Sequence, residues 1–140
     1  MTDSTTSDRH DVEDLVQALA ACLDEGRFAD LRELFTADAT ARTPGGAVEG
    51  ADALVAQAAR NHTAERATQH LIGGLQIALD GDTATARANA LVTFASLGGR
   101  PELVMGEVYR FGARRTADGW RLTRVETAPT WRVEAAADAA

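Results

Sequence analysis

The spacing of apolar residues changes part-way along this chain, and that change constrains the fold more than any other feature. In the first half, apolar residues recur every three or four positions, the period of an amphipathic helix, as in Val12, Leu15, Val16, Leu19 and Leu23. In the second half they alternate with polar residues, which is the period of a strand. Helices followed by a strand meander predict an α+β domain, with an antiparallel sheet and three N-terminal helices packed on one face.

Turn sequences divide the two halves into elements. The turns between the long strands are Asp80-Gly81-Asp82, Leu97-Gly98-Gly99-Arg100 and Ala117-Asp118-Gly119. The expected helices cover residues 8–26, 28–35 and a segment that begins near 52. The expected strands are a short one at 39–43 and long ones at about 71–79, 83–95, 102–114 and 120–133. Strands this long must coil, which gives the sheet a concave face and room for a pocket.

At 140 residues the chain has the size of one domain. We expect a polar tail at 1–7, a domain at 8–133 and an alanine-rich tail at 134–140, with both tails disordered. The formal net charge of −7 argues against nucleic acid and anionic lipid as partners. No apolar run approaches the ~20 residues of a membrane helix, and the N-terminus shows no signal-peptide pattern, so we expect a cytoplasmic protein.

The composition also argues against several kinds of catalytic site. All fourteen basic residues are arginine, so Schiff-base chemistry through a lysine is impossible. The sequence holds no G-x-x-x-x-G-K loop, no G-x-G-x-x-G after a strand and no G-x-S-x-G. The three histidines show no metal-ligand spacing with one another or with Cys22, which is expected to be a buried, inert thiol. We therefore expect neither a cofactor nor a metal.

One carboxylate lies in an otherwise apolar row of the strand expected at 102–114. The row reads Leu103, Met105, Glu107, Tyr109 and Phe111. If this face lines the core, Glu107 is removed from water, and it then has a raised pKa or a partner. The alternatives are an ion pair with Arg110, Arg121 or Arg124, or a place at an open rim.

The three histidines differ in their expected surroundings. His10 lies in the first helical turn, where we expect solvent exposure, and His62 continues the apolar side of its helix, which favours simple packing. His70 opens a sheet strand and is a candidate general acid or base near neutral pH, although a structural role is the commoner one for such a residue. Asp24 lies off the apolar stripe of the first helix, and the pattern alone favours an exposed position.

Four short segments resemble proteins of a known group. Leu23–Leu31 and Leu34–Ala39 resemble the helix-turn-helix opening of SnoaL-like domains in the nuclear-transport-factor-like superfamily. Thr68–Gly74 resembles scytalone dehydratase more closely, as does an ending that holds Asp118-Gly119-Trp120 and Trp131. The resemblance extends over nearly the whole chain between the tails. It implies a cone-shaped, curved, mixed sheet whose helices enclose a deep pocket, and assembly as a homodimer or homotrimer.

The same resemblance implies roles for individual residues. In scytalone dehydratase an aspartate orients a histidine that moves the proton in a cofactor-free dehydration, and Asp24 and His70 match these positions. A carboxylate-held imidazole is a sound general base, because the carboxylate fixes its tautomer and raises its basicity. Other catalytic positions of the family differ here, and they are occupied by Leu23, by Arg42 or Thr43, by Ala95 and by Glu107. The expected pocket lining also includes Met105, Tyr109 and Trp131.

These residues favour a cofactor-independent lyase, isomerase or cyclase acting on a small, apolar, enolisable molecule, such as a polyketide- or steroid-like intermediate. His70 is then the general base, Asp24 its orienting partner, and Glu107 a second acid, base or hydrogen-bond partner. The alternative is a non-catalytic protein that binds a hydrophobic ligand or assists a partner enzyme, which the departures from the family's catalytic set favour. A third possibility is a homo-oligomeric structural domain with a filled core.

Overall fold

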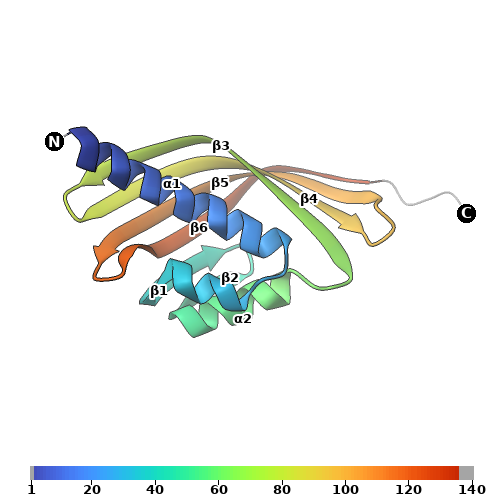
Figure 1. Cartoon of the computed structure of the whole chain (residues 1–140). Helices are drawn as coiled ribbons and strands as arrows, with labels where there is room; N and C mark the ends of the chain where they lie inside the picture. Colours follow the sequence, from blue (N-terminus) through green and yellow to red (C-terminus); the bar gives the residue numbers. More distant parts are fainter. Residues whose placement is uncertain (1, 136–140) are drawn as a thin grey trace, which may run out of the picture.

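The computed structural model describes residues 2–135, with side chains from Ser4 onward (Figure 1). The helical elements are α1 (Thr2–Asp24), the 3-10 helix η1 (Ala29–Leu34) and α2 (Ala51–Asn61). The strands are β1 (Phe35–Thr43), β2 (Gly46–Glu49), β3 (Arg66–Asp80), β4 (Thr83–Ser96), β5 (Pro101–Thr116) and β6 (Gly119–Glu134). In Figure 1, α1 lies across the sheet and α2 lies beside β1 and β2, which confirms the α+β prediction.

The six strands form one curved, unclosed sheet in the order β2-β1-β6-β5-β4-β3. Neighbouring strands are antiparallel except β1 and β6, which run parallel, so the sheet is mixed. The four long strands form the expected meander, and their turns fall at the expected sequences. The strand expected at 39–43 is the end of the longer β1. Strand β2 was not predicted, because its four residues at the sheet edge are too few to show an alternating pattern.

Helix α1 begins at Thr2, six residues before the N-cap expected at Asp8. Asp8 lies inside the helix and does not cap it. Its carboxylate accepts hydrogen bonds from Arg115 Nη1 at 2.9 Å, Arg115 Nη2 at 2.7 Å and Trp120 Nε1 at 3.1 Å. These bonds tie the start of α1 to β5 and β6. The tail expected at 1–7 is therefore helical from Thr2, while Met1 and residues 136–140 of the other expected tail lie outside the described residues.

The core lies between α1 and the concave face of the sheet. Val12 and Val16 of α1 are buried there, together with Phe111 of β5 and Leu122 of β6. Strand β4 contributes four buried alanines at alternate positions, namely Ala84, Ala86, Ala88 and Ala90. Their small side chains leave room above β4 for α1, which makes its closest approach to the neighbouring strand β3.

Irregularities in the strand pairing bend the sheet. The register between β3 and β4 shifts between Gly73 and Gln76, and the register between β5 and β6 shifts between Gly106 and Glu107. Bulges of this kind bend a strand and increase its twist. Gly74, inside the first of them, has φ of +58°, a conformation that favours glycine. The bent sheet and the helices enclose a cavity, in agreement with the pocket that strand length predicted.

Candidate active site

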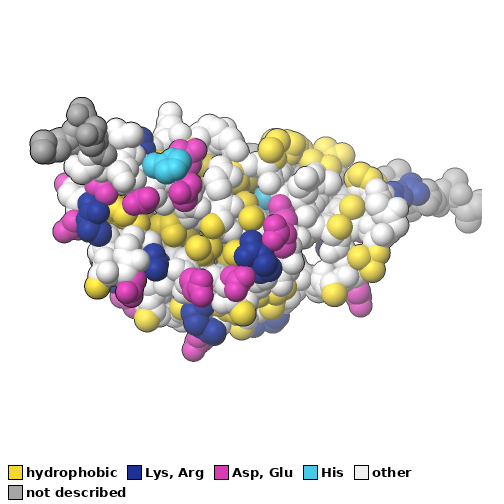
Figure 2. All heavy atoms as spheres, viewed as in Figure 1, with side chains coloured by type: hydrophobic (Ala, Val, Ile, Leu, Met, Phe, Trp, Pro, Cys, Tyr) yellow, Lys and Arg dark blue, Asp and Glu magenta, His cyan; other side chains and the backbone are white. Residues whose placement is uncertain are grey.

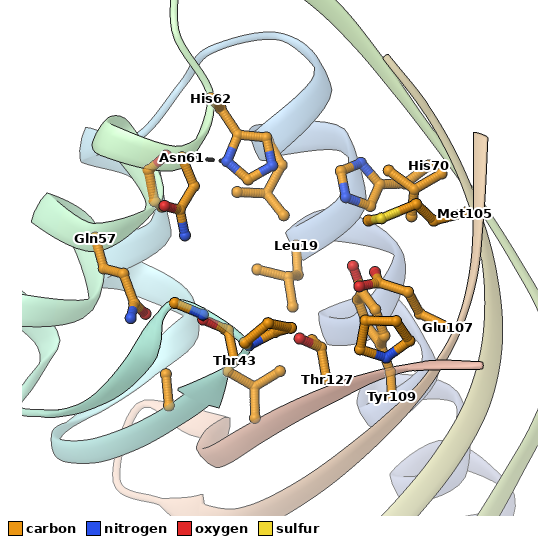
Figure 3. Close-up of a pocket in the computed structure, with 18 of the residues that line it drawn as sticks. Leu19, Thr43, Gln57, Asn61, His62, His70, Met105, Glu107, Tyr109 and Thr127 are labelled. Carbon is orange, nitrogen blue, oxygen red and sulfur yellow. Dashed lines mark hydrogen bonds between the residues drawn. The ribbon is translucent and has the colours of Figure 1, made fainter. Parts of the chain in front are cut away.

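A cavity of about 360 Å³ lies between the helices and the concave face of the sheet, which is enough space for a small molecule. Figure 3 shows that the side chains of His62, His70 and Glu107 point toward this space. Hydrophobic side chains also reach the surface at the right-hand end of Figure 2, where β4 and β5 extend beyond the helices. The cavity lining is mainly apolar and includes Leu19, Leu23, Leu31, Phe35, Leu54, Val92, Phe94, Leu103, Met105 and Val125. This cavity contradicts the third possibility, a structural domain with a filled core.

Asp24 and His70 form a hydrogen-bonded pair at the wall of this cavity. Asp24 is the last residue of α1, and His70 lies near the start of β3. The ring Nδ1–H of His70 donates to Asp24 Oδ1 at 2.5 Å, and the backbone N–H of His70 donates to Asp24 Oδ2 at 2.9 Å. Both carboxylate oxygens are thus held by the same residue.

This pairing fixes which nitrogen of the imidazole carries the proton. A carboxylate only accepts hydrogen bonds, so the Nδ1 atom of His70 carries a proton and, in the neutral ring, Nε2 carries the free lone pair. The side chain of His70 is 2% exposed and lines the cavity, while that of Asp24 is 21% exposed and lies behind it. The arrangement therefore presents a basic nitrogen to a ligand and supports the positive charge that forms when that nitrogen takes a proton.

Glu107 is buried on β5 within the same cavity, as its apolar row predicted. Burial raises the pKa of its carboxyl group, whereas a hydrogen bond from Tyr109 and the nearby His70 oppose that rise in pKa. No arginine in the described chain pairs with Glu107, so the ion-pair alternative is wrong. The pKa of Tyr109 lies well above its usual value, because its hydroxyl is buried and faces the Glu107 carboxyl group.

His62 also contributes to the cavity, although its sequence position favoured simple packing. It follows the last residue of α2, and its Nδ1 lies 2.9 Å from the carbonyl oxygen of Ala58. Its ring lies among Phe28, Phe94 and His70, at centroid distances of 6.3, 6.4 and 5.7 Å. Burial lowers the pKa of His62, so its charged form is disfavoured.

The structure divides the remaining expected pocket residues into two groups. Leu23, Met105 and Tyr109 line the cavity as expected. Arg42 does not, because strand side chains alternate and its neighbour Ala41 is the one that faces inward. Ala95 is also outside, since the preceding Phe94 takes the inward position on β4.

Trp131 lies on the opposite face of the sheet, which corrects its expected place in the pocket. Its indole covers Gly106, where a Cβ atom would lie 2.2 Å from the indole Nε1. The bulge between β5 and β6 shifts the register here, so that Gly106 is opposite Trp131 while Glu107 is opposite Pro129. An irregularity of this kind leaves no simple pattern in a single sequence.

Other predictions about single residues are confirmed. Cys22 is buried, and burial raises the pKa of its thiol. His10 is exposed beside Asp14. Thr127 and Gln57, which were not predicted as pocket residues, bring polar groups to the cavity wall. The inward position of Thr127 follows from alternation with the buried Val125, whereas nothing in the sequence marks Gln57.

The described residues contain neither a cluster of side chains fit for a metal ion nor a membrane-spanning helix. No group of three or more His, Cys, Asp and Glu side chains in this part of the chain is placed to hold a metal ion. No helix within residues 2–135 is long and apolar enough to cross a membrane.

Comparison with known proteins places the chain in a family. The model of the SnoaL-like domain matches residues 4–126. The chain belongs to the SnoaL-like family. Rv2910c of Mycobacterium tuberculosis, described as an uncharacterized protein, is 32% identical over 126 residues, a match that covers 86% of this SnoaL-like chain and 85% of the relative.

Solved structures share the same fold. An NTF2-like protein with a cystatin-like fold from Novosphingobium aromaticivorans is 28% identical, with a TM-score of 0.75 over 91% of this SnoaL-like chain and 84% of the other. A candidate scytalone dehydratase from the same organism is 22% identical, with a TM-score of 0.85 over 100% of this chain and 95% of the other. These matches confirm the SnoaL-like and scytalone-dehydratase-like resemblance of the fold.

Proposed function

We propose that this SnoaL-like protein is a cofactor-independent lyase, isomerase or cyclase that moves a proton on a small, apolar, enolisable molecule, of a polyketide- or steroid-like kind. The observation that carries the proposal is the Asp24–His70 pair, whose imidazole lines an apolar cavity. Proteins of the SnoaL-like and scytalone-dehydratase-like kind include cofactor-independent isomerases and dehydratases, which supports this reaction class.

In the proposed reaction, His70 Nε2 removes a proton from a carbon next to a carbonyl group. The electron pair of the C–H bond moves to the carbonyl oxygen and gives an enolate, while the new imidazolium is stabilised by Asp24. In an isomerisation, the protonated histidine gives its proton to another carbon of the conjugated enolate as the carbonyl re-forms. In an elimination, it gives the proton to a hydroxyl oxygen on the neighbouring carbon, whose C–O bond breaks as the enolate re-forms the carbonyl, so that water leaves.

In this proposal Glu107 stabilises the enolate. Burial raises its pKa and so favours the neutral acid, which can donate a hydrogen bond to the developing negative oxygen. The hydroxyl group of Tyr109 is hydrogen-bonded to the carboxyl group and orients it. The roles thus divide between a base on β3 and a hydrogen-bond donor on β5.

Deuterium exchange of a model ketone tests the proposal. We expect the protein to accelerate exchange of the α-protons of 1-tetralone in D₂O, followed by NMR. The variant His70→Ala should lose at least about 10²-fold of the acceleration, and Asp24→Asn at least about tenfold, because general-base catalysis contributes roughly 10²–10⁴-fold. His10→Ala is the matched control, since this histidine is exposed and does not line the cavity.

A His70→Ala variant that exchanges the ketone as fast as the wild type would show that the imidazole is not the base. If 1-tetralone binds to the wild type and is recovered with all its protons, the non-catalytic alternative, a hydrophobic-ligand-binding or accessory protein, replaces the enzyme hypothesis.

A further inference from the structure

The second imidazole in the cavity presents an unpaired acceptor. A carbonyl oxygen cannot donate a hydrogen bond, so the contact between His62 Nδ1 and the oxygen of Ala58 requires a proton on Nδ1. In the neutral ring, Nε2 is then an acceptor with a fixed direction, and it makes no hydrogen bond to any described residue of the chain. Figure 3 shows this second nitrogen on the side of the ring that faces His70 and the cavity.

The surroundings of His62 favour the neutral ring. Burial beside Phe28 and Phe94 disfavours a charge and is the largest effect on the pKa of His62. His70 and Arg66 also oppose the charged form, while the hydrogen bond to Ala58 and the nearby Asp24 act in the opposite direction. His70 cannot satisfy the free nitrogen, because its own open Nε2 is an acceptor as well. Two acceptors therefore face one apolar space, with ring centroids 5.7 Å apart.

A ligand with a hydroxyl group matches this arrangement. An acceptor in apolar surroundings costs free energy when it stays unpaired, so a site built around one discriminates against analogues without a donor. Because the two rings are close together, one small molecule contacts both of them.

We propose that His62 is a substrate-binding residue whose Nε2 accepts a hydrogen bond from a hydroxyl group, so that the substrate class is a hydroxylated apolar molecule with a phenol or enol group. This assignment rests on the proposed function, in which His70 acts on the carbon skeleton of the same molecule. His62 itself takes no proton from carbon in this scheme. Its role is to select the substrate and hold it in place.

Calorimetric binding of two matched probes tests the assignment. The probes are 4-ethylphenol and its methyl ether, in which a methyl group replaces the hydroxyl hydrogen, so that only the phenol can donate a hydrogen bond. Their Kd values are compared at pH 7.5. We expect the wild type to prefer the phenol by about tenfold. His62→Phe should bring the ratio of the two Kd values close to one while the ether still binds, because the ring that packs against Phe28 and Phe94 is kept.

Further variants sharpen the result. His62→Gln offers another acceptor and should keep part of the preference, whereas His62→Leu removes the acceptor without an aromatic ring, so a folding defect in one variant does not decide the outcome. His10→Gln serves as the control for loss of an exposed histidine. A wild-type protein without preference, or a preference that persists in both His62→Phe and His62→Leu, overturns the assignment.

Two comparisons distinguish the role of His62 from a hydroxyl contact made by Glu107 and from the proposed general base His70. A preference lost in Glu107→Gln and kept in the His62 variants assigns the hydroxyl contact to Glu107 and overturns the proposal for His62. The measurement requires no turnover, so it is independent of ketone exchange. A failure of His70→Ala to slow exchange refutes the general base and leaves the Kd ratio unaffected.

Discussion

At the scale of single residues, Glu107 shows how a carboxyl group is tuned by its surroundings. Its side chain is in an apolar row of β5, it is 7% exposed, and Tyr109 on the same face is its hydrogen-bond partner. Removal from water disfavours the charged form, and this effect outweighs the opposing contacts, so the pKa is raised. The burial that favours the protonated acid also makes this residue unfavourable for stability when it ionises.

The variant Glu107→Gln should therefore change how stability depends on pH. Between the unfolded pKa near 4.5 and the raised folded pKa, the folded protein holds a proton that the unfolded chain releases, so wild-type stability falls as pH rises through this window. Glutamine stays neutral, and we expect the variant to gain stability relative to the wild type as the pH rises from 4.5 toward the raised folded pKa. Urea unfolding at several pH values measures the difference.

The exposed Glu102 supplies the control for this experiment, as Glu102→Gln should produce no comparable trend. A constant difference between wild type and Glu107→Gln across the pH range would show that the carboxyl group is not destabilised by burial.

The sequence pattern predicted the burial of some of these residues but not of others. Alternation along β5 was enough to place Glu107, because a strand has only two faces. Asp24 and His70 came together only through family resemblance, since they are 46 positions apart and helical projection alone favoured an exposed aspartate. His62 was assigned to packing because projection onto a helix finds the inward side but does not show that this side ends at an open space.

At the scale of elements, the bulge between β5 and β6 decides on which face of the sheet Trp131 lies. Glu107 keeps the inward position that alternation along β5 gives it, while Trp131 lies outside, with its indole directly on Gly106. The close approach requires a residue without a side chain, because a Cβ atom at position 106 would lie 2.2 Å from the indole nitrogen.

We expect Gly106→Ala to destabilise the fold by about 1–3 kcal/mol, the usual cost of overpacking, because the indole must move away. The double variant Gly106→Ala, Trp131→Ala should be about as stable as Trp131→Ala alone, since the clash is then absent. Chemical denaturation of the three variants measures this coupling. Additive losses in the double variant would mean that the strain at Gly106 arises elsewhere than from the indole.

The elements themselves were largely predictable. The turns with Gly81, Gly99 and Gly119 marked the ends of the long strands, and each of these glycines has a positive φ. The start of α1 was missed because Asp8 matches the composition of an N-cap, while its actual partners, Arg115 and Trp120, are more than 100 residues away in sequence. Local patterns contain no information about such long-range partners.

At the scale of the whole molecule, the outer face of the sheet is unusually apolar. The strand registers place Leu71, Leu91, Gly106 and Trp131 side by side across four strands. Leu71 is 66% exposed, Leu91 40% and Trp131 49%, and Val133 continues the patch along β6. Apolar surface of this kind marks an interaction site in many proteins, and the SnoaL-like family often forms oligomers.

We propose that a second copy of the chain covers this patch, as a homodimer or homotrimer. Light scattering after gel filtration should give two or three times the monomer mass for the wild type, and a lower mass for Leu71→Gln combined with Trp131→Gln, because both changes remove apolar contact area. Thr85→Gln, on an exposed position of β4, is the control. A monomer mass for the wild type at every concentration tested would contradict the proposal.

The two hydrogen bonds that Asp24 accepts from His70 have a consequence for the evolution of this chain. One of its two bonds is made by the ring of His70 and the other by the backbone of that residue, which every amino acid except proline supplies. A descendant that exchanges the histidine for another side chain thus gives up the base but keeps a connection between the end of α1 and β3. A single substitution at position 70 thus removes the general base while one hydrogen bond that holds the fold together remains. The cavity can then bind another ligand without catalysis.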